Sequence, residues 1–424
     1  MNTLFKAVSW AHNTNIYEVN VRQYTAEGSF NAFAKHLTRL KGMGVKTLWF
    51  MPIHPIGNVK RLSTLGSYYS IKDYKAINPE FGVLDDFKKL VEQAHALGLK
   101  VLIDWVANHT SWDNVWTKEH PDFYERDEAE NFKSPYDWFD VIQVNHQNKH
   151  QQEAMIDAMK FWVHECDIDG FRCDMAHLVP LSFWLEARHE LDKIKPLFWL
   201  AETEQADYHQ VFDASYTWEF LHKMEVYWKH ETDIAGIDSL LTKYDTLFPP
   251  SAIRMYFTSN HDENSHSGSE YERMGDAAEA FAVFCATWNG IPLVYSGQEL
   301  PLLKRLKFFE KDEIPWVGNC IQENFYKILL HLHSQHPALR AGDPAVQTFR
   351  IKTNDKDVFA FLRKNEEREV LVMLNLSQEN KMYIDILDEK ITGIFRNVFS
   401  DVSVEFNSQS VFEIQPWKYL VFEK

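Results

Sequence analysis

About the first 300 residues of the chain alternate between short apolar runs and amphipathic helical patterns. The apolar runs are rich in β-branched and aromatic residues, which is typical of strands covered on both faces. Eight strands that alternate with helices predict a closed parallel barrel, the (β/α)8 or TIM barrel. The eight runs occupy residues 16–23, 45–52, 99–105, 169–174, 197–202, 211–218, 253–259 and 291–297.

A doubly wound open sheet is the alternative fold for such a pattern. It would more often place a glycine-rich phosphate loop after the first strand, and residues 16–23 are followed by no such loop. Amphipathic patterns predict helices over residues 30–44, 84–98 and 152–167, and the first two end at glycines that suit a helix C-terminus. We therefore prefer the barrel.

Two further regions stand out from the repeating pattern. Residues 111–148 form a long polar and aromatic loop after the third strand, and a loop of this length in a compact domain is usually functional. We expect it to lie over the barrel mouth as a short subdomain. Beyond Pro337 the sequence changes to short alternating segments separated by charged turns, which predict an antiparallel β-sandwich. We assign residues 1–343 to the barrel and residues 344–424 to the C-terminal sandwich.

The composition excludes some classes of partner and favours another. A formal net charge of −17 argues against nucleic acid. The most apolar stretch, residues 280–297, is broken by Asn289, Gly290 and Pro292, so we expect no membrane span. The chain has 14 tryptophans, and flat aromatic faces suit the binding of sugar rings.

The cysteines and the N-terminal residues indicate in which cellular compartment the protein is expected. The four cysteines show no CxxC pairing, which favours a reducing environment. The N-terminal residues contain no long apolar segment of the kind found in signal peptides. We therefore expect a cytoplasmic protein.

Four carboxylates end separate predicted strands: Asp104, Asp174, Glu202 and Asp262. In a (β/α)8 barrel the C-terminal strand ends form the catalytic face, and converging carboxylates suit glycosidic bond cleavage. Arg172 shares a strand face with Asp174, so its charge should lower the pKa of Asp174 and keep that carboxylate ionised. Glu202 follows an apolar run that should raise its pKa. Taken singly, Asp174 and Glu202 would each more often belong to a structural ion pair.

Short motifs in this order resemble those of the α-amylase superfamily of glycoside hydrolases. DWVANH (104–109), GFRCD (170–174) and SNHD (259–262) look like its first, second and fourth motifs, and the strand end at Glu202 matches the third. GSYYSIKDYKAINPEFG (66–82) resembles another stretch of these enzymes. The resemblance covers essentially the whole chain. It implies a retaining hydrolase of α-1,4-glucosidic bonds in maltodextrins or starch-type α-glucans.

The resemblance implies three catalytic residues. Asp174 would be the nucleophile that forms a covalent glycosyl-enzyme, and Glu202 would be the general acid and then the base. Asp262 would bind sugar hydroxyls and stabilise the oxocarbenium-like transition state. Retention of configuration implies that the carboxyl groups of the nucleophile and the acid lie about 5–5.5 Å apart.

The resemblance also implies substrate-binding residues around these three. Tyr69 would stack on the sugar ring, and His109 and His261 would hydrogen-bond that sugar. Arg172 would orient Asp174, and Asp104 would belong to the network that supports the strand ends.

The sequence departs from the pattern of calcium-dependent α-amylases. Asn108 matches one calcium ligand, but Gln143 stands where an aspartate is expected and Leu178 where a histidine is expected. Calcium prefers several oxygen ligands with carboxylates among them. We therefore predict no calcium and no other cofactor here, and expect Asn108 to hydrogen-bond the loop backbone. His177 occupies the position of a lysine that contacts the leaving group in many starch-acting members, so it is a further substrate-binding candidate.

Three functions stay open from sequence. The first is the α-glucan hydrolase. The second is a transglycosylase or an α-glucoside isomerase of the same superfamily, since the motifs do not separate water from a sugar hydroxyl as the acceptor. The third is a non-catalytic carbohydrate-binding subunit, which the presence of all three carboxylates argues against. The expected partner is an α-glucan, and the oligomeric state is left open.

Overall fold

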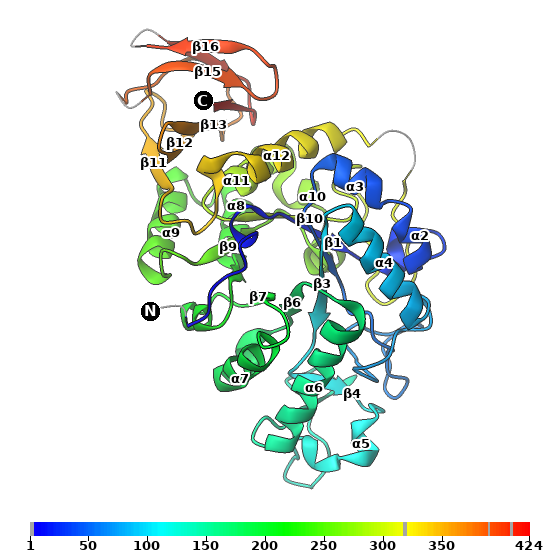
Figure 1. Ribbon diagram of the computed structural model, residues 1–424. Coiled ribbons are helices and arrows are strands. Elements are labelled where there is room, and N and C mark those ends of the chain that lie inside the picture. The colour runs from blue at the N-terminus through cyan, green and yellow to red at the C-terminus, as the bar shows by residue number, and fades with distance from the viewer. Residues whose placement is uncertain (1–3, 317–319, 389–390, 408–409) are drawn as a thin grey trace.

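The computed structural model describes residues 4–316, 320–388, 391–407 and 410–424. Eight parallel strands close into a barrel in the order β1-β10-β9-β8-β7-β6-β3-β2, which confirms the predicted fold (Figure 1). All eight predicted runs contain a barrel strand. The strands are β1 (Ile16–Val19), β2 (Thr47–Phe50), β3 (Lys100–Trp105), β6 (Gly170–Cys173), β7 (Phe198–Ala201), β8 (Ala214–Tyr216), β9 (Ile253–Tyr256) and β10 (Ile291–Tyr295).

Helices surround the barrel and cover its outer face (Figure 1). They are α1 (Val21–Tyr24), α2 (Phe30–Ala34), α3 (Leu37–Met43), α4 (Leu84–Ala96), α6 (Lys149–Cys166), α7 (Leu181–Leu191), α8 (Trp218–Trp228), α9 (Ile234–Leu247), α10 (Glu270–Met274), α11 (Ala278–Thr287) and α12 (Glu323–Gln335). Short single-turn helices are η1 (Ala11–Asn13), η3 (Ala176–Leu178), η4 (Ala206–Gln210), η5 (Glu263–Ser267), η6 (Gly275–Ala277) and η7 (Pro337–Leu339). None of the helices in the described ranges is long and apolar enough to cross a membrane.

Two predicted helices differ from the structure. The single helix expected over residues 30–44 is wrong, because the chain forms α2 and α3 with a break between them. The side chain of Ser29 caps α2, and Gly44 ends α3 in the left-handed region at φ 97°. Helix α6 begins earlier than residue 152, because the Asn148 side chain accepts hydrogen bonds from the first free backbone N–H groups.

The segment after β3 has secondary structure of its own. It contains an antiparallel pair, β4 (His109–Ser111) and β5 (Val141–Gln143), together with α5 (Trp116–Glu119) and η2 (Pro121–Phe123). A small apolar cluster holds it together, formed by Phe123, Tyr124, Ile142 and Val144. These contacts give the segment a small core of its own, and its place over the barrel mouth stays a prediction.

The C-terminal part forms two antiparallel sheets. One contains β11 (Gln347–Ile351), β12 (Val358–Asn365), β13 (Arg368–Asn375), β18 (Tyr419–Glu423), β15 (Gly393–Asn397) and β16 (Ser403–Phe406), and the other pairs β14 (Lys381–Asp385) with β17 (Val411–Ile414). Side chains of both sheets share one apolar core, as in the predicted sandwich. The opposite face of the larger sheet packs on α11, where Phe359 and Phe361 contact Phe284. This contact fixes the sandwich against the barrel.

Candidate active site

One buried guanidinium connects the strand-end carboxylates. Arg172 on β6 is fully buried, and its Nη1 donates to Asp104 Oδ1 at 3.1 Å and to Asp174 Oδ1 at 3.0 Å. Its Nη2 lies 2.9 Å from Glu202 Oε2, an ion pair whose angle does not fit a hydrogen bond. Its Nε donates to the Tyr216 hydroxyl at 3.0 Å. Carboxylates from β3, β6 and β7 therefore converge on a single cation.

Tyr69, in the loop after β2, joins the group around Arg172 to His261 through its hydroxyl. Its hydroxyl donates to Asp104 Oδ2 at 3.1 Å and lies 2.8 Å from His261 Nε2. His261 in turn contacts Glu18 through Nδ1, and its Nε2 lies 3.2 Å from Asp262 Oδ2. Asp104 and Glu18 are wholly buried, so they act from beneath the cavity floor. Asp104 thus supports Arg172 and Tyr69.

The pKa values of Asp174 and Glu202 are both shifted upward. Burial raises the pKa of Asp174, and Arg172 opposes this without cancelling it, so the predicted lowering is wrong. The reason is that both residues lie where water is largely excluded. Burial and the charge of Asp174 raise the pKa of Glu202, while Arg172 opposes them, which confirms the predicted direction for Glu202.

His261 and Asp262 behave as a charged pair. Burial lowers the pKa of His261, but the charges of Asp262 and Glu18 outweigh it and raise that pKa well above its usual value. Burial raises the pKa of Asp262, but His261 outweighs it and lowers that pKa. Asp262 is consequently ionised over a wider pH range than Asp174 or Glu202, as suits a residue that stabilises positive charge.

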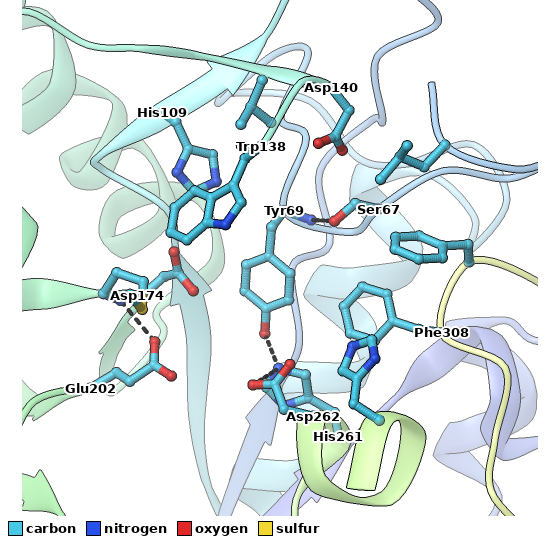
Figure 2. Close-up of a pocket in the computed structure, with 15 residues that line it drawn as sticks. Ser67, Tyr69, His109, Trp138, Asp140, Asp174, Glu202, His261, Asp262 and Phe308 are labelled. Carbon is cyan, nitrogen blue, oxygen red and sulfur yellow. Dashed lines mark hydrogen bonds and ion pairs between the residues drawn. The ribbon is translucent and has the colours of Figure 1, made fainter. Parts of the chain in front are cut away.

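These groups surround a cavity of about 370 Å³ at the C-terminal ends of the strands. Figure 2 shows Asp174, Glu202 and Asp262 around the Tyr69 ring, with His109 and Trp138 above Asp174. The cavity is lined by Leu62, Ser67, Tyr69, His109, Trp138, Asp140, Val141, Asp174, Met175, Glu202, His261, Asp262, His266, Phe308 and Phe309. A cavity with convergent carboxylates and aromatic walls suits a sugar ring.

Comparisons with known proteins agree with this geometry. The model of the α-amylase catalytic domain matches residues 10–143. The crystal structure of a noncanonic maltogenic α-amylase, AmyB from Thermotoga neapolitana, is 33% identical, covers 97% of this chain and 99% of its own, and superimposes with a TM-score of 0.88. The chain belongs to the α-amylase family of glycoside hydrolases.

Two other α-amylases are similar to this α-amylase family member over most of its length. The crystal structure of an α-amylase from Lactobacillus plantarum is 29% identical, with 98% and 99% of the two chains covered and a TM-score of 0.88. The α-amylase MalA of Haloarcula japonica is 28% identical over 88% of this chain. The present chain spans 57% of the length of MalA.

Most of the substrate-binding candidates of this α-amylase family member lie together. Tyr69, His109 and His261 line the cavity, whereas Arg172 and Asp104 lie beneath it. Burial lowers the pKa of His109 to about 4, so this histidine is neutral near pH 7 and can donate or accept. His177 lies on η3 outside the cavity lining, so its contact with substrate stays a prediction.

Several lining residues were not found from sequence. Trp138 and Asp140 come from the segment after β3, and Phe308 comes from a loop after β10. The Phe308 ring is stacked near Tyr69, with centroids 6.3 Å apart, and extends the aromatic wall. None of the three ends a barrel strand, and Trp138 and Phe308 lie in no motif that resembles the family. The aromatic enrichment of residues 111–148 was the only signal for Trp138.

The residues at the calcium position of related enzymes do not fit a calcium ion in this α-amylase family member. The Asn108 side chain lies 3.3 Å from His109 Nδ1, and its main-chain carbonyl accepts from Val144. The expected bond to the loop backbone is thus made by the main chain of Asn108 and not by its side chain. Within the described ranges no group of three His, Cys, Asp or Glu residues could hold a metal ion.

Proposed function

We propose that the protein is a retaining hydrolase that cleaves α-1,4-glucosidic bonds in maltodextrins and starch-type α-glucans. The observation that carries this proposal is the pair Asp174 and Glu202, which contact two nitrogens of one guanidinium and face the same cavity. The retaining mechanism needs a carboxylate nucleophile and a carboxylic acid at the same glycosidic bond, and the shared contact with Arg172 supports these roles for Asp174 and Glu202. The names of the relatives, among them a maltogenic α-amylase, support the substrate class.

Glycosylation of the enzyme is the first step. Asp174 Oδ1 is held by Arg172, while Oδ2 accepts no hydrogen bond from the described residues and is the oxygen left to attack the anomeric carbon. As the Oδ2–carbon bond forms, the glycosidic bond breaks. The leaving oxygen takes the proton of Glu202, and burial, which raises the pKa of Glu202, favours its protonated form. Asp262, ionised beside His261, stabilises the positive charge that develops on the ring.

Deglycosylation reverses the roles. Glu202, now a carboxylate, takes a proton from a water molecule, and that oxygen attacks the anomeric carbon as the bond to Asp174 breaks. The main-chain N–H of Met175 donates to Glu202 Oε2 at 2.8 Å and orients the carboxylate for this step. A sugar hydroxyl in place of water would give transfer.

Product analysis tests this function. The protein is incubated with maltoheptaose, and products are separated by length. Hydrolysis predicts shorter maltodextrins and a matching increase in reducing ends. Longer or branched products without new reducing ends would establish the transferase, and binding without turnover would establish a carbohydrate-binding protein.

The pH dependence of kcat/KM should identify the acid. Because burial raises the pKa of Glu202, activity should persist above the ordinary glutamate pKa of about 4.3 and fall as Glu202 loses its proton. Glu202→Gln has no proton to lose. With p-nitrophenyl α-maltoside, whose leaving group needs little protonation, this variant should lose the alkaline fall in the glycosylation rate. An unchanged alkaline fall would contradict the assignment of Glu202.

We also propose that activity needs no calcium. The calcium position offers Asn108, Gln143 and Leu178, a set without any carboxylate. Exhaustive chelation should leave the rate of maltoheptaose hydrolysis and the melting temperature unchanged. A loss of either that added calcium restores would overturn this proposal.

A further inference from the structure

Four carboxylates line the cavity, and the proposed mechanism uses only three of them. The fourth is Asp140, which immediately precedes β5 in the segment after β3. It is only 6% exposed, although it is not at a barrel strand end and is not one of the catalytic candidates of the sequence. Figure 2 shows its carboxylate directed toward the cavity between Trp138 and Ser67.

The carboxylate of Asp140 makes no ion pair and no hydrogen bond with any other residue in the described ranges, and its one hydrogen bond comes from its own main-chain N–H. The main-chain carbonyl of Asp140 accepts from the Ser70 hydroxyl at 3.2 Å. Burial raises the pKa of Asp140, and its own main-chain N–H opposes this without cancelling it, while no cation among the described residues contributes. A carboxylate largely removed from water is costly when no other residue donates to it. A purely structural role therefore leaves Asp140 unexplained, whereas a ligand that donates hydrogen bonds would complete its environment.

The position of Asp140 indicates which part of a glucan it meets. Glu202 protonates the oxygen of the departing sugar, so the leaving chain lies on the Glu202 side of the cleaved bond. Figure 2 shows Asp140 across the cavity from Glu202, near Ser67 and the top of Tyr69. Asp140 is thus on the side of the sugar that becomes attached to Asp174.

We propose that Asp140 is a specificity-determining residue that accepts hydrogen bonds from hydroxyl groups of the glucosyl units on the glycone side of the cleaved bond. This inference rests on the proposed function. A carboxylate is a stronger acceptor than a neutral oxygen, and removing its charge typically costs about 10- to 100-fold in binding. Asp140 positions substrate and takes no part in bond cleavage.

The test compares Asp140→Asn with Asp137→Asn, which removes the same charge from an exposed residue of the same loop. Two substrates are used. In p-nitrophenyl α-maltoside every sugar lies on the glycone side, while maltoheptaose also extends to the leaving side. Asp140→Asn should lower kcat/KM about 10- to 100-fold for both substrates, chiefly through KM. Asp137→Asn should stay within about twofold of wild type for both.

A loss confined to maltoheptaose would place Asp140 on the leaving side and overturn the inference, as would wild-type kinetics for both substrates. If wild type turns over neither substrate, the proposed function fails, and the inference with it. Should Asp140→Asn not fold, wild type is measured with monodeoxy p-nitrophenyl α-maltosides. At least one deletion of a glycone hydroxyl should then cost about tenfold or more, and uniform kinetics across the series would contradict the inference.

Discussion

Replacing Asp174 with glycine is expected to lower kcat on maltoheptaose by roughly 10⁴- to 10⁶-fold, the loss seen when a covalent nucleophile is removed. The substitution also opens space beside the anomeric carbon. Added azide should enter it and displace the leaving group directly, in a single inversion. With an activated α-maltosyl fluoride, the product should be the β-maltosyl azide.

The matched variant is Glu202→Ala, which keeps the nucleophile but lacks the acid and base. With an activated substrate this variant should still form the glycosyl-enzyme. Azide should then attack the anomeric carbon, break its bond to Asp174 with a second inversion, and give the α-maltosyl azide. The two variants therefore predict azides of opposite configuration. The α-azide from Asp174→Gly, or turnover near wild type, would show that another residue is the nucleophile.

Replacing Arg172 with methionine is expected to have the largest effect on stability. Arg172 contacts Asp104, Asp174 and Glu202, and it is fully buried. Its removal leaves these carboxylates facing one another without a counter-charge, and breaking a buried ion pair in this way costs about 3–5 kcal/mol. The free energy of unfolding, measured by denaturant titration at pH 7, should fall by this amount, and activity should be lost with it.

The loss of unfolding free energy in Arg172→Met should depend on pH. Burial already raises the pKa of Asp104, and Arg172 opposes that shift, so its removal raises the pKa further. A carboxyl group whose pKa is higher in the folded than in the unfolded state destabilises the fold as pH rises above the unfolded value of about 3.9. The deficit of Arg172→Met should thus be largest near neutral pH and shrink toward pH 4.

A second substitution provides the control for this prediction. Adding Asp104→Asn to Arg172→Met removes one of the unpaired buried charges while keeping an acceptor for Trp49 Nε1, which donates to Asp104 at 3.1 Å. The double variant should regain part of the lost stability. A deficit that is the same at pH 4 and pH 7, and is unaffected by the second substitution, would show that Arg172 contributes through packing and not through charge.

The strand-end carboxylates could be predicted from sequence because strand geometry is local. The alternation of faces is enough to place Arg172 beside Asp174, and the C-terminal strand ends of a parallel barrel all meet at one face. The motifs around these residues then supplied the family. The eight strands could be located from apolar runs alone, because the pattern of a buried strand is also local.

The pKa of Asp174 could not be predicted in the same way. The sequence showed the neighbouring cation but not the extent of burial, and burial proved the larger influence. The contact between Tyr69 and His261 joins residues 192 positions apart, which no local pattern encodes. Asp140 lies in an irregular segment whose path depends on packing against β4 and the barrel, so its place in the cavity required the structure.

The anomeric configuration of the first product tests the central claim most directly. Maltoheptaose hydrolysis by wild type can be followed by proton NMR within the first minutes, before the anomers equilibrate in water. Two displacements at the same carbon, through Asp174, predict that the newly formed reducing ends appear first as the α-anomer. The β-anomer appearing first would mean a single displacement by water, and would contradict the assignment of Asp174 as a covalent nucleophile.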